Sequence, residues 1–504
     1  MLPKNPPPSV RPIHRPALRQ GALALTLLAL LAQAAAHDWP SPSAPPASVR
    51  HADWPGLLWA GPRSGAPPAP SATDCDRPPQ AIELDGPQSP ERDRNLGHLM
   101  ERRDAAAAAE APAAPPASSK VESAASPAAA LADRAERAEG PALRHPMPTE
   151  ASPQRPSAEP VTAGVVDDNA DFGAYMDFHR RHARLSPRSQ DVSERYQLTV
   201  HDAEGRPVPD AEVALQATRG GPVLHARTDA GGQVWLHPRV AGLAAGLIEV
   251  QVRKASADGM LQGSAVLRRG QRDALQVSLD SADAAQPARL DLVFLVDATG
   301  SMADEIDKLR QSMQTIADEI AALPSRPRTC FALVAYRDRG DAFFVRAHDF
   351  TSDLAAFQRV LGGLRANGGG DYPEALNEAL HTAVHRLSWR GDGATRLLLL
   401  VADAPPHLDR GAPWYDDDMQ GALARGIKLF TLGASGLDRR GEVVFRQLAQ
   451  FTGGRFVFLT YEDARRPGSG PGRETVHEVR NYSVQTLDRL IVKLVREELA
   501  RRPA

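Results

Sequence analysis

The chain has 504 residues and a formal net charge of −3 at pH 7. Length alone predicts about three domains, and the nearly balanced charge gives no strong attraction to nucleic acid or to anionic membranes. With two cysteines, Cys75 and Cys330, neither a disulfide framework nor a cysteine-based zinc cluster can form. We expect both to be free thiols, and a bridge between them is the less favoured alternative.

Residues 1–36 have the layout of a secretory signal peptide. Basic residues without acids precede an apolar run from Gly21 to Leu31, and small residues at 32–36 fit a cleavage site. The apolar run is shorter than the roughly 20 residues of a membrane span, so cleavage is favoured over an uncleaved anchor. We expect export to the periplasm, to the cell surface or as a secreted protein.

Residues 37–165 lack sustained periodicity and are rich in proline and alanine. Such a composition buries too little apolar surface to offset the entropy of ordering, so a disordered linker is expected. It is either a stalk or simply tolerated disorder. The aromatic residues Phe172, Tyr175 and Phe178 then predict a short segment, residues 166–190, that docks on the following domain.

Residues 191–282 predict an all-β domain. Apolar and polar residues alternate over five short runs, at 196–200, 213–215, 234–236, 248–252 and 275–277. Short strands at this spacing are typical of an antiparallel β-sandwich. The segments at 202–211 and 228–234 resemble the immunoglobulin-like domains common on bacterial surface proteins, where such a domain is a spacer.

Residues 288–502 alternate between strand and helix patterns. This is typical of an α/β fold with a doubly wound parallel sheet, and there is room for one antiparallel edge strand near Phe343. The stretch from Leu292 to Met302 is the most informative, because a buried strand runs through Asp-Ala-Thr-Gly-Ser into an amphipathic helix. Ligands of such sheets bind at the carboxyl ends of the strands.

Three loops at that edge carry oxygen donors. The first holds Asp297, Thr299 and Ser301, the second is Gly-Gly-Gly-Asp-Tyr-Pro-Glu with Asp371, and the third begins with Asp403. Carboxylate and hydroxyl oxygens suit a hard divalent cation. Asp416 to Asp418 are expected to add negative charge on the same side.

Helix capping and turn formation are the alternative explanation of these residues. Ser301 with Asp304 could cap one helix, and Asp371 with Glu374 could form a capping box on another. Asp403 could be an ordinary turn residue. Three independent caps seldom converge on one crevice, so the cation site is favoured.

At these loops the chain resembles the von Willebrand factor A (VWA) domain, from Leu290 to about Arg502. That family carries a metal-ion-dependent adhesion site with Asp-x-Ser-x-Ser in the first loop, threonine in the second and aspartate in the third. Asp297, Ser301 and Asp403 match directly, Thr299 supplies the hydroxyl of a serine, and Asp371 departs from threonine. The resemblance implies one bound cation, Mg²⁺ first and Ca²⁺ or Mn²⁺ as alternatives, and a protein ligand.

The sequence therefore predicts an exported, metal-dependent protein-binding protein of the adhesion type rather than an enzyme. It has no Gly-x-x-x-x-Gly-Lys phosphate loop and no Gly-x-Ser-x-Gly elbow. His407 could lie at the rim of the site, but an exposed turn residue is favoured. The alternatives are a metal-dependent hydrolase or enzyme-accessory subunit, and a structural module whose cation only rigidifies the loops. No nucleic acid is expected as a partner, and membrane contact only if the signal segment is uncleaved.

Overall fold

The computed structural model describes residues 70–71, 74–84, 86, 161–217, 221–257, 259–280, 287–370, 372–391, 393–480 and 482–503. All of them fall within one compact unit, Trp59–Ala504. The predicted signal peptide, most of the predicted linker and Asp371 lie outside the described residues. Among the described residues, no helix combines the length and the apolar character needed to cross a bilayer.

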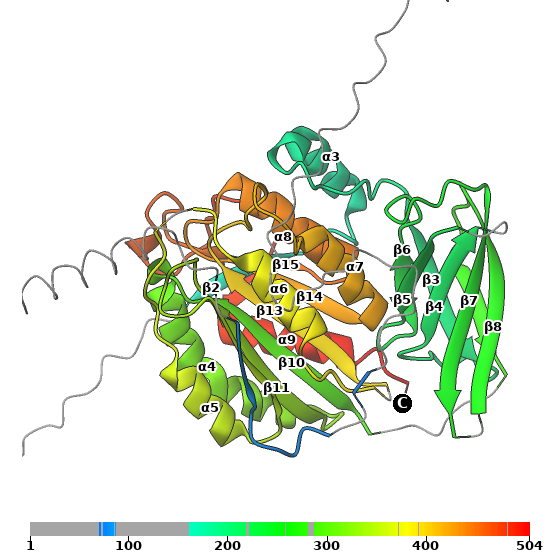
Figure 1. Cartoon of the computed structure of the whole chain (residues 1–504), viewed down its shortest axis with the longest axis horizontal. Helices are drawn as coiled ribbons and strands as arrows, with labels where there is room; N and C mark the ends of the chain where they lie inside the picture. The colour runs from blue at the N-terminus through cyan, green and yellow to red at the C-terminus, as the bar shows by residue number, and fades with distance from the viewer. Residues whose placement is uncertain are drawn as a thin grey trace, which may run out of the picture. The chain divides into compact units, whose positions relative to one another are not determined.

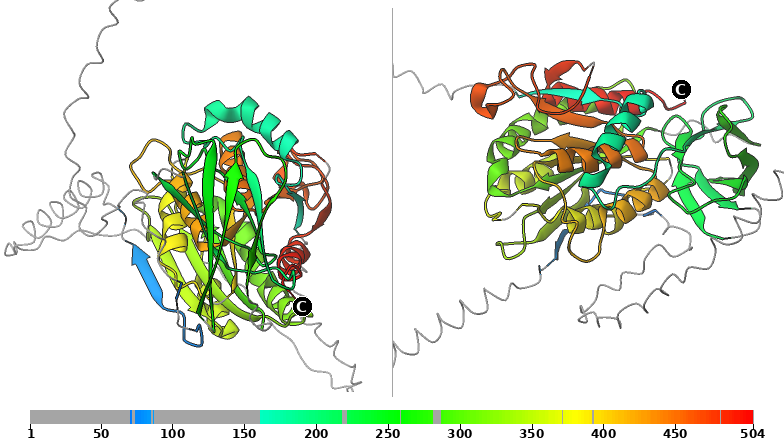
Figure 2. Two further views of the ribbon diagram at one scale, coloured as in Figure 1. Left: turned by 90° about the vertical axis from the view of Figure 1, so that its right-hand side faces the viewer. Right: turned by 90° about the horizontal axis from the view of Figure 1, so that it is seen from above.

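A large mixed sheet, with helices on both faces, organises the described part of the chain (Figures 1 and 2). Its centre is parallel, in the order β11-β10-β13-β14-β15. These strands are β10 (Arg289–Asp297), β11 (Arg328–Tyr336), β13 (Thr395–Ala402), β14 (Ile427–Gly433) and β15 (Phe456–Thr460). Every residue of β13 and β14 is buried, as expected for strands covered on both faces.

Alternate residues of β10 point to opposite faces of the sheet and belong to two separate hydrophobic cores. Phe294 and Val296 pack with one group of helices, and Val293 and Leu295 pack with another. The first group is α4 (Ala303–Ala321), α5 (Leu354–Gly363) and α9 (Leu487–Leu499), and the second is α6 (Leu376–His385), α7 (Tyr415–Arg425) and α8 (Arg439–Phe451). The predicted α/β class is confirmed for this part of the chain.

Antiparallel strands complete the sheet at both edges, whereas the sequence predicted one such strand. β12 (Val345–Thr351) pairs with β11, and β1 (Ala81–Leu84) pairs with β12. At the other edge β2 (Thr162–Val166) pairs with both β15 and β16 (Val484–Thr486). β1 and the start of β2 therefore correct the prediction of disorder throughout 37–165. Both strands are short and pair with residues far away in sequence, so local composition gives no sign of them.

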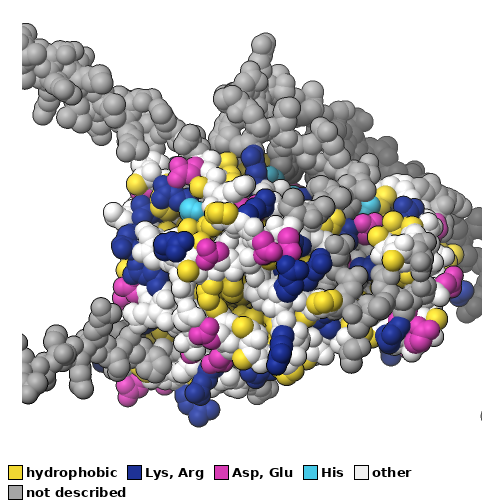
Figure 3. Space-filling model, turned by 90° about the horizontal axis from the view of Figure 1, so that it is seen from below, with side chains coloured by type: hydrophobic (Ala, Val, Ile, Leu, Met, Phe, Trp, Pro, Cys, Tyr) yellow, Lys and Arg dark blue, Asp and Glu magenta, His cyan; other side chains and the backbone are white. Residues whose placement is uncertain are grey.

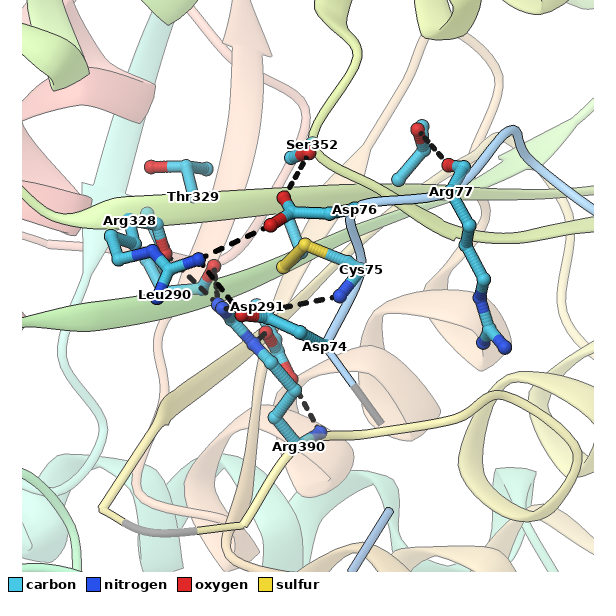
Figure 4. Close-up of a disulfide and its surroundings, with 12 residues drawn as sticks. Asp74, Cys75, Asp76, Arg77, Leu290, Asp291, Arg328, Thr329, Ser352 and Arg390 are labelled. Carbon is cyan, nitrogen blue, oxygen red and sulfur yellow. Dashed lines mark hydrogen bonds and ion pairs between the residues drawn. A yellow bond between two sulfur atoms is a disulfide. The ribbon is translucent and has the colours of Figure 1, made fainter. Parts of the chain in front are cut away.

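Residues 74–84, here called the N-terminal strap, are fixed to the sheet by a disulfide (Figure 4). Cys75 and Cys330 are bonded, with Cα atoms 6.0 Å apart, so the expectation of two free thiols is wrong. The sequence separation of 255 residues hides this proximity. Asp74 also pairs with Arg328 at 2.8 Å, and the Ser352 hydroxyl donates to Asp76 at 2.7 Å.

The middle part of the chain forms two smaller sheets. One has the order β6-β3-β9 and the other β5-β4-β7-β8. Their strands are β3 (Tyr196–Asp202), β4 (Glu212–Ala217), β5 (Val223–Arg227), β6 (Gln233–Leu236), β7 (Leu247–Ser256), β8 (Gly259–Arg268) and β9 (Leu275–Leu279). The pairing is antiparallel except between β3 and β9, which are parallel, so the predicted antiparallel pattern is incomplete. The immunoglobulin-like assignment stays a prediction.

Buried ion pairs join these small sheets to the α/β domain. Asp210, in the loop before β4, accepts hydrogen bonds from Arg396 of β13 at 2.8 Å and from Arg227 at 3.0 Å. Lys428 of β14 lies between Asp229 at 2.8 Å and Glu498 at 2.6 Å. Each carboxylate or ammonium group thus has an opposite charge in reach, as burial requires.

The segment after β2 packs on the α/β domain as well as on the domain that follows it, whereas the sequence predicted the following domain alone. Its helix α3 (Phe172–His182) lies near α8 in Figure 1. Arg446 of α8 donates two hydrogen bonds to Asp168, at 2.6 and 2.9 Å. The same guanidinium lies 3.9 Å from the ring centre of Phe178. On the other side, the guanidinium of Arg195, in the following domain, lies 3.6 Å from the ring centre of Phe172. The aromatic cluster is therefore a packing surface, as expected, but for both domains.

The charges on the molecular surface are mixed. On the face shown in Figure 3, acidic and basic side chains alternate with apolar ones, and neither sign forms a continuous field. This mixture agrees with the small formal net charge of the chain.

Candidate metal centre

The first loop folds back on the carboxylate that ends β10. Asp297 is fully buried, and its Oδ1 accepts hydrogen bonds from the Thr299 backbone N–H at 2.9 Å and hydroxyl at 2.8 Å. The hydroxyl oxygens of Thr299 and Ser301 are 3.4 Å apart. Alternate positions of the loop thus bring three oxygen-bearing side chains together.

The third loop approaches the first because their strands are neighbours. β10 and β13 are parallel, with Val296 opposite Val401, so Asp297 and Asp403 leave the sheet at the same edge. Burial raises the pKa of Asp403, and the nearby hydroxyl of Ser301 partly offsets that shift. Asp297, Thr299, Ser301 and Asp403 are therefore brought together, as the sequence predicted.

The second carboxylate oxygen of Asp297 is buried and accepts no hydrogen bond from any residue that the structure describes. Burial and the neighbouring charge of Asp403 raise the pKa of Asp297 to about 7. The Tyr336 hydroxyl, at the end of β11, lies close to Asp297 and partly offsets this rise in the pKa of Asp297. A buried oxygen without a donor costs free energy unless a cation or a proton satisfies it.

The second loop packs against both of the others. The Gly300 N–H donates to the Gly368 carbonyl at 3.1 Å, and the Glu374 N–H donates to the Pro405 carbonyl at 3.1 Å. Gly369 has a φ of +74°, and a Cβ there would lie 3.0 Å from the Cβ of Thr299. Glycine therefore permits the close approach of this loop to the first. Asp371, two residues further on, lies outside the described residues.

Glu374 is a site residue that the sequence reasoning treated only as a helix cap. It is 5 % exposed, and a Cβ on Gly369 would lie 3.2 Å from its Oε1. Burial raises the pKa of Tyr336, and the negative charge of Glu374 raises it further, as do those of Asp297 and Asp403. The sequence could have indicated Glu374 as a candidate ligand, because it lies in the same loop as Asp371, just after Pro373.

Arg337, at the end of β11, holds the loops in register. Its Nε donates to the Ala298 carbonyl at 3.1 Å, and its Nη2 donates to the Arg365 carbonyl at 2.5 Å. The first loop and the chain leading into the second are thus bridged by one planar guanidinium, which presents several donors in a fixed geometry.

Helix capping does not account for the first two loops. The N-cap of α4 is Met302, and the turn η2 (Gly300–Met302) before it follows Thr299; neither has a side-chain cap hydrogen bond within the described part of the chain. The N-cap of α6 is Ala375, so Asp371 is not the first residue of a capping box. The hydroxyls of Thr299 and Ser301 are therefore not used to cap a helix. The Thr299 hydroxyl donates its proton to Asp297, which leaves its oxygen lone pairs for a ligand.

Two further expectations about this edge are wrong. His407 is not an exposed turn residue: it is 4 % exposed, and its Nε2 lies 3.5 Å from Asp338 Oδ1. The acidic residues at the start of α7, Asp416 to Asp418, are paired with basic or polar side chains and do not leave uncompensated negative charge. Asp416 accepts hydrogen bonds from Arg188 at 3.0 Å and from Gln190 at 2.6 Å, and Asp418 contacts two histidines.

Comparison with known proteins identifies the domain. Residues 291–406 match the family model described as von Willebrand factor A domain, so the chain contains a VWA domain. A protein named as an ariadne-like RING finger protein, from Acanthamoeba polyphaga mimivirus, is 32 % identical over 24 % of this chain and 11 % of its own length. Alpha-protein kinase vwkA of Dictyostelium discoideum is 29 % identical over 28 % of this chain and 22 % of its own length.

Other similarities are to hemicentin-1 and to the structure of a pilus adhesin. Human hemicentin-1 is 33 % identical over 18 % of this chain and 2 % of its own length. The chain thus spans only a small part of these relatives. The crystal structure of the pilus adhesin SpaC from Lactobacillus rhamnosus GG covers 50 % of this chain and 32 % of its own, with 12 % identity and a TM-score of 0.29. That likeness is too weak to support a conclusion.

Proposed function

We propose that the VWA domain binds one divalent cation at the meeting point of its three loops and uses this centre to engage another protein. The observation that carries the proposal is the buried, hydrogen-bond-free Oδ2 of Asp297, set among described residues beside two hydroxyls and a second carboxylate. Asp297, Thr299, Ser301 and Asp403 would hold the ion, with Asp371 from the second loop.

The chemistry of these donors supports a hard cation. Carboxylate and hydroxyl oxygens are the ligands that Mg²⁺, Mn²⁺ and Ca²⁺ share, and Mg²⁺ is the first choice because it retains exchangeable water positions. A doubly charged ion would also relieve the repulsion between Asp297 and Asp403 that contributes to the raised pKa of Asp297. When bound, the ion supplies a positive centre to which an oxygen of the ligand can bind.

The surroundings of the loops support a protein ligand. Tyr372, in the second loop, is 49 % exposed, and its hydroxyl accepts a hydrogen bond from the Asp438 N–H at 3.2 Å. An exposed tyrosine held in place at the rim offers the kind of anchor enriched in protein interfaces. An added carboxylate at Asp371 would lower the electrophilicity of the ion, so the ligand oxygen is expected to come from a weakly acidic or neutral group.

The disulfide supports export. Bonds between cysteines persist in the periplasm, at cell surfaces and in secreted proteins, and are rare where thiols are kept reduced. The bridge between Cys75 and Cys330 thus favours the exported protein that the N-terminal sequence predicts.

The proposal is tested by capturing extracellular proteins on the immobilised full chain, in Mg²⁺ and in chelator, and identifying what is retained. We expect ligands that bind in Mg²⁺, are released by chelator and are lost in Asp403→Asn. Asp409→Asn is the matched control, because its side chain is 81 % exposed in the same loop. If Mg²⁺ raised the melting temperature while the retained proteins stayed identical with and without chelator, the cation would be only structural.

A further inference from the structure

A second cluster of metal-ligand side chains lies on the helices that cover one face of the sheet. His381 and His385 are four residues apart on α6 and so share one side of that helix. Asp418 belongs to the first turn of the neighbouring helix α7. One nitrogen of each histidine and one oxygen of Asp418 all lie within 4.8 Å of one another.

The two histidines converge on a single carboxylate oxygen of Asp418. His381 Nδ1 and His385 Nε2 are each 2.9 Å from Asp418 Oδ1. The Asp418 side chain is 1 % exposed, and among the described residues its other oxygen, Oδ2, has no hydrogen-bond partner. The imidazoles of His381 and His385 are 18 % and 32 % exposed. The cluster therefore has a buried carboxylate at its base and histidines that reach solvent.

A glycine on α7 makes room for one of these rings. A Cβ on Gly421 would lie 2.8 Å from Cε1 and 2.9 Å from Nε2 of His385. Glycine inside a helix costs roughly 0.5–1 kcal/mol relative to alanine, yet here it lets the imidazole nitrogen lie against the helix, directed at Asp418. Side-chain packing alone would be served better by a residue with a Cβ.

We propose that His381, His385 and Asp418 form a second metal site, which takes a transition-metal ion of the Zn²⁺ class. Two imidazoles and a carboxylate suit Zn²⁺, and imidazole nitrogen separates this site from the oxygen-rich centre of the three loops. Three protein ligands leave a fourth position, on the exposed side of the histidines, for water or for a ligand from a partner.

Metal binding requires only small movements. Zn²⁺ ligands at about 2.0–2.2 Å in a tetrahedron lie roughly 3.3 Å apart, which is slightly more than the present 2.9 Å separations. Each facing nitrogen must offer a lone pair in place of a proton, so the metal replaces the two hydrogen bonds to Asp418. The alternative is that the histidines only neutralise a buried carboxylate by hydrogen bonding.

The metal site and the purely hydrogen-bonded cluster can be distinguished by measuring zinc binding. The full chain is first treated with chelator, and its Zn²⁺ affinity is then measured in competition with a chromophoric chelator. We expect His385→Ala to lower Zn²⁺ affinity by about tenfold or more, and the Co²⁺ form of the unmodified chain to show the visible bands of a tetrahedral site. His182→Ala is the matched control, because His182 also contacts a carboxylate, Glu478 at 2.9 Å, but without a second histidine. Equal Zn²⁺ affinity in the two variants would overturn the proposal.

Gly421→Ala provides an independent test that keeps all three ligands. The new methyl group collides with the His385 ring, so Zn²⁺ affinity should fall while the circular dichroism spectrum is preserved. Mg²⁺ titrations of the same variant should match those of the unmodified chain, because the three-loop centre shares no ligand with this cluster. Unchanged Zn²⁺ affinity in Gly421→Ala would contradict the assigned role of His385.

Discussion

Asp297 shows at the scale of one residue why the three-loop centre calls for a cation. One carboxylate oxygen is fully engaged by Thr299, and the other is buried without a hydrogen bond from the described residues, with the Tyr336 side chain as its polar neighbour. Burial and Asp403 both disfavour the ionised form, so without a counterion the carboxyl titrates near neutrality. Residues selected for stability alone would not leave this arrangement, which is typical of functional sites.

Replacing Asp297 by asparagine should weaken cation binding. The side chain keeps its size and its acceptor for Thr299, but the charge that faces the ion is lost, so we expect Mg²⁺ affinity to fall by at least about tenfold, or about 1.4 kcal/mol. Isothermal titration of Mg²⁺ and Mn²⁺ into Asp297→Asn measures this change. Asp304→Asn, at an exposed position in the first turn of α4, should bind like the unmodified chain.

Asp371 is the position at which the chain departs from the threonine of the resembling family. We expect Asp371→Thr to weaken cation affinity, because one carboxylate is removed, and to strengthen attachment to carboxylate-bearing ligands, because the ion becomes more electrophilic. Titration of Mg²⁺, followed by binding of an acidic peptide, measures both quantities. A fall in both would show that Asp371 plays another part.

At the scale of elements, the periodic segments were predictable and the edges were not. β10 follows from the apolar run that begins at Leu292, and the structure starts this strand three residues earlier, at Arg289, and ends it at Asp297. β1 has four residues in a proline-rich region, and it gains its place from pairing with β12 and from the Cys75–Cys330 bridge. Such non-local constraints leave no local pattern.

The site was predictable to the extent that it follows strand ends. Asp297 and Asp403 are fixed by the ends of two adjacent parallel strands, which the sequence marks clearly. Glu374 and His407 lie in loops whose path is set by contacts such as Glu374 with Pro405 and His407 with Asp338. These contacts link distant residues, so burial of the two side chains could not be deduced from their neighbours in sequence.

Reduction of the disulfide should release the N-terminal strap. The bridge closes a loop of 255 residues, and loss of such a constraint typically costs about 2–5 kcal/mol. Cys75→Ser should therefore lower the midpoint of chemical unfolding and speed amide exchange in β1 and β12, with little change in β14. If exchange in β1 were the same with and without the bridge, the strap would be held by its hydrogen bonds and ion pairs alone.

At the scale of the whole molecule, Asp210 couples the small sheets to the large one. Burial alone would raise its pKa, but the charges of Arg396 and Arg227 hold it well below the usual 3.8. Its φ of +56° lies in the left-handed region, which asparagine also tolerates. Asp210→Asn therefore removes the charge without forcing a new backbone conformation.

We expect Asp210→Asn to destabilise the chain by about 3–5 kcal/mol at pH 7, as for other buried pairs that lose one partner. Because the folded-state pKa of Asp210 is depressed, its contribution is fully present well above pH 3.8 and declines as the pH falls below that value. Urea unfolding at pH 7 and pH 3 should show a difference between variant and unmodified chain that shrinks in acid. Glu204→Gln, with a side chain 61 % exposed, should change stability by less than about 0.5 kcal/mol.

The central claim, that three separated loops assemble one cation site, is tested most directly by anomalous diffraction from crystals of the chain grown with Mn²⁺. The account predicts an anomalous peak within about 2.0–2.3 Å of side-chain oxygens from the first and third loops, Ser301 and Asp403 among them, and its absence in Asp297→Asn crystals. Mn²⁺ bound elsewhere, with none between these loops at saturating concentration, would contradict it.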